Sequence, residues 1–147
     1  MEQILYGAPV AKQLDEISLK IFQEVKSNNK TPHMTAITVG DNPASLLYVS
    51  RKKEKAEELG VEFNWIKLDK NTSQEKLKEL VETESKNTDG LIIQLPLPDH
   101  LSSEDVINCI PPDVDVDGLT SYNLGGLFSN EYKLIPATSL AVLELLN

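Results

Sequence analysis

The feature that most constrains the fold is the apolar run from Gly90 to Leu95, which ends at Pro96. The run is too short for a helix, and its nearly continuous apolar character is typical of a central parallel strand that is covered on both faces. One polar residue, Gln94, stands near its end. A buried amide needs partners, so Gln94 is expected either to bond to nearby backbone or to point at a ligand.

The rest of the chain alternates between strand and helix patterns. Further strands are predicted at 34–39 and 61–68, with a short edge strand at 4–6. Helices are predicted at 14–25, at 43–59, after a cap at Thr72 or Ser73, at 103–109 and from a cap at Thr138 to the end of the chain. This alternation predicts one α/β domain, residues 1–147, with three layers: a mainly parallel sheet and helices on both faces. The ligand crevice should lie outside the carboxyl ends of the strands, where Gly40 and Gln94 stand.

A long irregular stretch is expected between Pro112 and the glycine pair Gly125-Gly126. It contains Asp113, Asp115 and Asp117, whose alternating carboxylates suggest an oxygen-ligated metal. The stretch lacks the rest of a twelve-residue calcium loop, however, so we expect no metal site. Loops of this kind are where binding residues often lie.

Charge and cysteine content limit the partners. The chain has 14 Lys plus Arg against 23 Asp plus Glu, a net charge of −9 that argues against nucleic acid. No window is long and apolar enough for a signal peptide or a membrane span, so neither a membrane nor secretion is expected. The single cysteine, Cys109, excludes an intramolecular disulfide and is interpreted as a buried structural thiol in a cytoplasmic protein.

Tyr48 and Lys52 form the first candidate for chemistry, because residues four apart lie on one helix face and can share a proton network. A lysine acts as a general base only where burial or a cationic neighbour lowers its pKa towards neutrality. From the spacing alone, the pair is equally an ordinary tyrosine at the core edge beside a surface lysine.

Taken together, these segments resemble the bifunctional methylenetetrahydrofolate dehydrogenase/methenyltetrahydrofolate cyclohydrolase family. The resemblance rests on the order and content of four motifs: VGDNPAS at 39–45, the Tyr48-x-x-x-Lys52 spacing, DGLIIQLPLP at 89–98 and PPDVDVDGLTSYNLGGL at 111–127. It extends from ILYGAPVA at 4–11 to LIPATSLAVLELL at 134–146.

The resemblance implies an enzyme of one-carbon folate metabolism that oxidises 5,10-methylenetetrahydrofolate and hydrolyses 5,10-methenyltetrahydrofolate to 10-formyltetrahydrofolate. It assigns Lys52 as the central acid–base residue, positioned by Tyr48 and Gln94, and assigns Asp117 to the pterin. The implied folate contacts are Tyr48, Lys52, Gln94, Pro96, Leu97 and Asp117. A homodimer and an NADP or NAD cofactor are implied for the full-length enzyme.

The sequence also departs from the family pattern. The family's dinucleotide-binding Rossmann domain would follow the last helix, which is expected to begin the linker to it, but no G-x-G-x-x-G fingerprint is present. Thr138 is the one residue assigned to the cofactor, and tight dinucleotide binding by this chain is not expected. The family's cysteine, proline and glycine near the nicotinamide are Ala137, Ser139 and Ala141 here, and Gly126 replaces a usual arginine. These departures argue against hydride transfer.

Two alternatives therefore stay open at the level of sequence. The chain is either part of a longer enzyme, which the uncapped apolar final helix favours, or a natural product without the dinucleotide half. In function, it is either the folate-binding catalytic half of the enzyme or a non-catalytic folate-binding or oligomerisation module. A shikimate dehydrogenase amino-terminal domain has a similar architecture but matches the motifs poorly.

Overall fold

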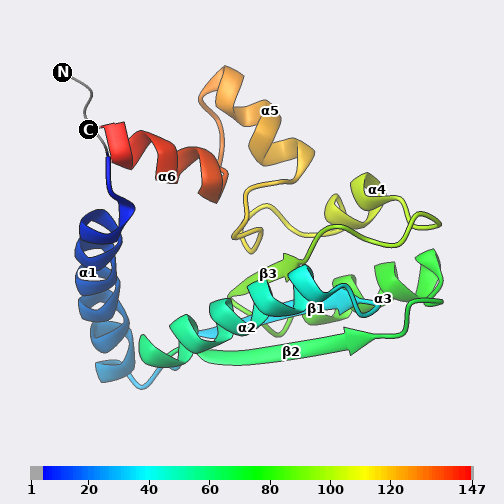
Figure 1. The fold of residues 1–147 in the computed structure, drawn as a ribbon, viewed down its shortest axis with the longest axis horizontal. Helices are drawn as coiled ribbons and strands as arrows, with labels where there is room; N and C mark the ends of the chain where they lie inside the picture. Colours follow the sequence, from blue (N-terminus) through cyan, green and yellow to red (C-terminus); the bar gives the residue numbers. More distant parts are fainter. Residues whose placement is uncertain (1–4, 147) are drawn as a thin grey trace.

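A parallel three-stranded sheet forms the centre of the molecule (Figure 1). The computed structural model describes residues 5–146, and its strands are β1 (His33–Val39), β2 (Glu62–Leu68) and β3 (Gly90–Ile93). The sheet order is β2-β1-β3, with Ile37 opposite Ile66 on one side and Ile93 on the other. The predicted α/β class with a parallel sheet is confirmed.

The prediction that the Gly90–Leu95 run is the central strand is wrong, because β1 is central and β3 pairs with β1 alone among the named strands. All four residues of β3 are nevertheless buried. The free edge of β3 is covered by the segment after Pro112: Leu91 bridges to Asp115, and its amide donates to the Val114 carbonyl at 2.8 Å. The apolar run therefore indicated correctly that both faces of the strand are buried. An edge strand can also be buried in this way when a loop covers its free edge.

Helices cover both faces of the sheet. They are α1 (Gly7–Ser27), α2 (Pro43–Glu58), α3 (Gln74–Glu84), α4 (Ser103–Ile107), α5 (Ser121–Ser129) and α6 (Ala137–Leu146). On one face, Val49 of α2 packs with Ala36 and Ile92. On the other, Leu77 of α3 and Val106 of α4 join the larger cluster. Figure 1 shows α1 and α6 standing at one end of the molecule, away from the layered part.

The apolar stripe of α1 is not buried by the described residues. Leu14, Ile17 and Ile21 are each at least 44% exposed, although the helix itself forms as its spacing predicted. The same holds for Val142 and Leu143 of α6, which are 52% exposed. The two helices touch each other near the ends of the chain (Figure 1). The buried core is thus formed by the sheet, helices α2, α3 and α4, and the segments that contain Leu97, Leu101 and Ile110.

The start of α2 is defined by Asn42 and Pro43. The Asn42 side-chain oxygen accepts hydrogen bonds from the amides of Ala44 and Ser45, at 3.0 and 3.1 Å, and Pro43 occupies the first helical position. Both are common helix-start features, because the capped amides have no partner within the helix and proline has no amide to satisfy. The predicted start at Pro43 is confirmed, and it sets which side chains of α2 face the sheet.

Three expectations near the chain ends need correction. The stretch around Gly125-Gly126 is part of α5 rather than irregular. Thr138 lies inside α6 rather than at its cap, because the Leu140 amide donates to the Pro136 carbonyl at 3.0 Å. Of the predicted edge strand at 4–6, Ile4 lies outside the described residues, and residues 5–6 adopt no strand.

Cys109 follows the short α4 and is partly buried. Its thiol donates to the Asp105 carbonyl at 3.2 Å, and burial raises the pKa of the thiol above its usual value of 9.0. Within residues 5–146, no helix has the length and apolar content needed to cross a membrane.

Candidate functional site

Lys52 and Asp117 form an ion pair between α2 and the segment after β3. The Lys52 Nζ lies 3.4 Å from the Asp117 Oδ2, and the two side chains are 34% and 28% exposed. A pair this open to water contributes little to stability, about 1 kcal/mol or less. Both groups are therefore partly open to solvent, and the structure brings together two residues that the family resemblance assigns to one site.

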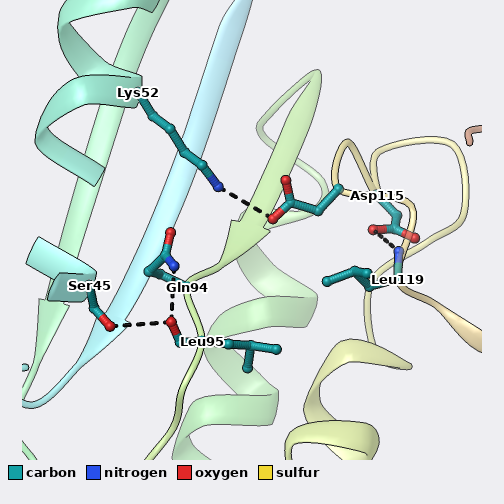
Figure 2. Close-up of polar contacts among 7 residues, drawn as sticks. Ser45, Lys52, Gln94, Leu95, Asp115 and Leu119 are labelled. Carbon is teal, nitrogen blue, oxygen red and sulfur yellow. Dashed lines mark hydrogen bonds and ion pairs between the residues drawn. The ribbon is translucent and has the colours of Figure 1, made fainter. Parts of the chain in front are cut away.

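Gln94 lies directly after β3, at the carboxyl end of the strand as expected. Its Nε2 donates to the Leu95 carbonyl at 3.0 Å, whereas its Oε1 is buried and has no hydrogen-bond partner among the described residues. Figure 2 shows the Lys52 and Gln94 side chains pointing into the same space. Of the two alternatives for Gln94, its nitrogen takes the bond to nearby backbone, while its oxygen is left without a partner among the described residues. A buried acceptor without a partner costs about 1–3 kcal/mol.

Ser45 is a site residue that the sequence analysis did not single out. Its hydroxyl donates to the Leu95 carbonyl at 3.2 Å, the same oxygen that Gln94 binds, and its side chain is buried (Figure 2). This contact ties the first turn of α2 to the end of β3. The available signal was the place of Ser45 in VGDNPAS, three residues after the helix cap.

Tyr48 lies one turn before Lys52 on α2, as the spacing predicted. It is 57% exposed, and its hydroxyl makes no hydrogen bond to any residue from 5 to 146. Its phenol ring is one wall of the cleft described below. The structure thus places Tyr48 beside Lys52 without a direct proton-sharing contact.

Pro96 and Leu97 follow Gln94, and the Leu95–Pro96 peptide bond is cis. Pro96 is exposed, whereas Leu97 is 8% exposed and packs within the larger core cluster. Of the two residues implied as apolar contacts for the folate ring, only Pro96 presents its side chain at the surface.

A cleft of about 570 Å³ runs alongside α2 and is lined by Tyr48, Lys52 and Asp117 at one end. The rest of its lining is largely apolar, with Met34, Ala56, Leu59, Val61, Ile92 and Val116 among the residues. It extends towards the amino ends of β1 and β3, so its volume does not lie outside the carboxyl ends as expected. Gln94 does not line the cleft. The Lys52–Asp117 pair lines the end of the cleft that is nearer to the carboxyl ends of the strands.

Lys55 joins α1 to the rim of this cleft. Its Nζ lies 2.8 Å from Glu58 and 2.9 Å from Asp15 of α1. Hydrogen bonds to Glu58 and then to Asp15 raise the pKa of Lys55 above its usual value of 10.5. Phe22 of α1 also lines the cleft. These contacts hold α1 across one side of the opening.

The three aspartates of the DVDVDG segment have three different surroundings. Asp113 is 74% exposed and pairs with Lys133, Asp115 is buried among hydrogen-bond donors, and Asp117 faces Lys52. No three His, Cys, Asp or Glu side chains within residues 5–146 gather where they could hold a metal ion.

Thr138, the residue assigned to a cofactor, is exposed in the first turn of α6. Its neighbour Ala137 donates its amide to the Asp117 carbonyl at 3.4 Å. Gly126, the second residue of the glycine pair, lies in α5, and a Cβ there would lie 2.9 Å from the Tyr132 backbone. That glycine is explained by close packing of the chain on itself rather than by a phosphate.

Comparison with known families gives one match that covers most of the chain. Residues 5–117 match the family described as tetrahydrofolate dehydrogenase/cyclohydrolase, catalytic domain. The matched range includes Tyr48, Lys52, Gln94 and Asp117.

Individual relatives agree. The chain is 38% identical over 146 residues to the bifunctional protein FolD of Bacillus pumilus, covering 98% of this chain and 52% of the relative. It is 40% identical over 148 residues to the mitochondrial bifunctional methylenetetrahydrofolate dehydrogenase/cyclohydrolase 2 of Mus musculus, covering 97% of this chain and 43% of the relative. The chain therefore spans about half the length of the curated relatives it matches.

Solved structures share the fold. A 5,10-methylenetetrahydrofolate dehydrogenase from the silkworm, Bombyx mori, superposes with a TM-score of 0.93 at 34% identity, over 99% of this chain and 51% of that one. The methylenetetrahydrofolate dehydrogenase-cyclohydrolase of Trypanosoma brucei, complexed with NADP and an inhibitor, has a TM-score of 0.89 at 28% identity, over 99% and 52%.

Proposed function

Because the chain belongs to the tetrahydrofolate dehydrogenase/cyclohydrolase family, as a catalytic domain of one-carbon folate metabolism, we propose that it binds a tetrahydrofolate derivative and supplies its acid–base chemistry. The observation that supports this best is the Lys52–Asp117 pair at the end of an apolar cleft, beside the unpartnered Oε1 of Gln94. An apolar cleft with a few convergent polar groups is the usual form of a small-molecule site.

Asp117 is the proposed anchor for the pterin. A carboxylate has acceptors for two neighbouring N–H groups, which the aminopyrimidine ring of a pterin offers, and such a charge-assisted contact fixes orientation. Tyr48, which lines the cleft together with Asp117, and the exposed Pro96 are the proposed apolar contacts. Binding at Asp117 would place the reactive carbon of the folate towards Lys52.

Lys52 is the proposed acid–base group for hydrolysis of 5,10-methenyltetrahydrofolate. The oxygen of a water molecule forms a bond to the cationic methenyl carbon and gives up one proton. The resulting hydroxyl loses its proton as the bond from that carbon to N5 breaks, N5 takes up a proton, and the carbon remains on N10 as a formyl group. One group that accepts and returns protons serves both steps, and help of this kind is worth about 10²–10⁴-fold in rate.

Hydride transfer requires a nicotinamide cofactor: the related structure from Trypanosoma brucei is a complex with NADP, and the related enzyme from Saccharomyces cerevisiae is NAD-dependent. Since the given sequence carries no G-x-G-x-x-G fingerprint, we derive no dehydrogenase step for this chain. Its proposed part in a dehydrogenase is to hold the folate. A homodimer is likewise proposed only for the full-length form.

The proposal is tested by following the loss of methenyltetrahydrofolate absorbance with the 147-residue chain, in a buffer where spontaneous hydrolysis is slow. Lys52→Met should remove the enzyme-dependent rate. Lys53→Met is the matched control, because Lys53 lies on the same helix, is 43% exposed and pairs with Glu57 rather than Asp117. Hydrolysis at the buffer rate by the unaltered chain, or equal rates for the two variants, would overturn the proposed role of Lys52.

The alternative of a non-catalytic folate-binding module is favoured by one observation: the site is open on one side, with Tyr48 more than half exposed. Folate binding without hydrolysis above the buffer rate, unchanged by Lys52→Met, would support that alternative. The same two proteins therefore distinguish the two functions.

A further inference from the structure

The buried side chain of Asp115 stabilises the turn at 115–120, which contains Asp117. Its side chain is 1% exposed; Oδ1 accepts from the Leu119 amide at 3.1 Å, and Oδ2 accepts from the Thr120 amide at 2.8 Å. Figure 2 shows Asp115 and Leu119 side by side. The Asp115 carbonyl also accepts from the Gly118 amide at 2.9 Å. Three successive amides, from residue 118 to residue 120, thus donate hydrogen bonds to Asp115.

Asn123 links this turn to two other segments. Its side chain is fully buried, and its Nδ2 donates to the Asp115 Oδ2 at 2.9 Å and to the Pro112 carbonyl at 3.1 Å. Its Oδ1 accepts from the amides of Lys133 and Leu134, at 3.0 and 3.1 Å. The amide uses both of its donors and both of its acceptor positions. Asn123 therefore joins the segments before and after α5 to the Asp115 carboxyl group.

Asp117 lies between Asp115 and the backbone amides that Asp115 binds. Its own carboxylate makes none of the hydrogen bonds that stabilise the turn. Its side chain contacts Lys52 at 3.4 Å, and its carbonyl accepts from the Ala137 amide at 3.4 Å. The position of the Asp117 carboxylate is therefore set by the backbone of the turn.

We propose that Asp115 and Asn123 are positioning residues, which hold the Asp117 carboxylate where it can bind the aminopyrimidine ring of a pterin. This inference rests on the proposed function and adds two residues to it. Burying a carboxyl group and an amide is costly, and apolar side chains of similar size stabilise a core at least as well. The hydrogen bonds of Asp115 and Asn123 meet at the turn that carries Asp117 towards Lys52. They can fix the backbone of this turn, which apolar side chains at the same positions could not do.

The test measures the binding of two ligands to the 147-residue chain by titration calorimetry: 5-formyltetrahydrofolate, which contains the pterin, and p-aminobenzoylglutamate, which lacks it. Asp115→Asn should weaken binding of the first about tenfold or more and leave the second unchanged, because only the first reaches Asp117. Asp113→Asn is the matched control, since it makes the same chemical change on an exposed side chain two residues away. Thermal unfolding identifies a temperature at which every variant is folded, and Asn123→Ser takes the place of Asp115→Asn if the latter does not fold.

A double-mutant cycle with Asp117→Ala separates positioning from a general structural effect. If Asp115 acts through Asp117, Asp115→Asn causes no further loss of 5-formyltetrahydrofolate binding in the Asp117→Ala protein. An additive loss, or an equal loss for both ligands, would overturn the positioning role. Retained binding by Asp115→Asn beside lost binding by Asp117→Ala would refute the positioning role alone, and retained binding by Asp117→Ala would refute it together with the proposed pterin contact.

Discussion

The turn that contains Asp117 depends on a glycine, and replacing it should destabilise the protein strongly. Gly118 has a φ of +67°, a conformation that costs an ordinary L-residue about 1–2 kcal/mol. A Cβ at this position would lie 2.7 Å from the Pro136 nitrogen and 2.8 Å from the Ile135 carbonyl carbon. Both are backbone atoms, so the contact cannot be relieved by rotating a side chain.

Gly118→Ala is therefore expected to lower the free energy of unfolding by about 2–5 kcal/mol, the sum of the conformational cost and an overpacking cost of about 1–3 kcal/mol. For a chain of this length each 1 kcal/mol corresponds to roughly 2–4 °C in Tm. Urea unfolding followed by circular dichroism measures the change directly. Hydrolysis and folate binding should fall in the same variant, because the segment at Pro136 must move away from Asp117.

Gly125→Ala is the matched control. Gly125 is exposed in the middle of α5, and a Cβ there would have no atom within 4 Å. Alanine is the better helix former by about 1 kcal/mol, so this variant should be as stable as the unaltered chain or slightly more stable. A Gly118→Ala protein within about 0.5 kcal/mol of the unaltered chain, or a Gly125→Ala protein destabilised as much as Gly118→Ala, would refute the reasoning.

Three further outcomes are expected from the packing and the charges. Leu77→Ala, at a fully buried position, should cost about 2–5 kcal/mol in urea unfolding, whereas Leu143→Ala, at a 52% exposed position, should cost less than about 0.5 kcal/mol. Cys109 should react with iodoacetamide at pH 8 more slowly than free cysteine until urea unfolds the chain, because burial raises its pKa and leaves less thiolate; equal rates would contradict this. Because the pKa of Lys55 is raised in the folded protein, its charged contacts should stabilise the protein fully below pH 10.5, and this stabilisation should disappear as the pH rises through the folded pKa. The difference in unfolding free energy between the unaltered chain and Asp15→Asn should therefore vanish at that high pH. A difference that does not change with pH would count against the contact.

Periodicity predicted the three strands and helices α1 to α4, but not the position of β3 in the sheet. The run at Gly90–Leu95 identifies a strand with both faces buried, and it is one. A hydrophobic pattern contains no information about which neighbour covers each edge, and here the covering segment is the loop at Val114 and Asp115, some twenty residues later in the chain. That pairing depends on tertiary contacts, which no local pattern records.

The helix α5 was missed because two adjacent glycines usually indicate a turn. In the structure, Thr120 caps the helix by accepting from the Asn123 amide at 3.3 Å, and Gly126 allows the Tyr132 backbone to approach. The Thr-x-x-Asn spacing was visible in the sequence, but the need for a small residue at Gly126 arises only when the later segment folds back over the helix.

The arrangement of the candidate site was also predictable from the sequence only in part. The i, i+4 spacing predicted that Tyr48 and Lys52 share a face of α2, which follows from helix geometry alone. The contact of Lys52 with Asp117, sixty-five residues later, was available only through the family resemblance. Asp115 and Asp117 look alike in the sequence, and their opposite surroundings, one closing the turn and one facing Lys52, become visible only when the turn has formed.

Gln94 shows why an exception to a hydrophobic pattern is informative. An apolar side chain at this position would leave no unpaired acceptor, and the buried Oε1 without a partner instead costs stability. Ser45 and the Gln94 nitrogen both donate to the Leu95 carbonyl, and this contact orients the Gln94 amide with its nitrogen towards the backbone and its oxygen away from it. Under the proposed function, a bound folate, or the Lys52 ammonium that it releases from Asp117, would supply the partner that this oxygen lacks. The one residue that interrupts the apolar run is therefore a proposed ligand contact.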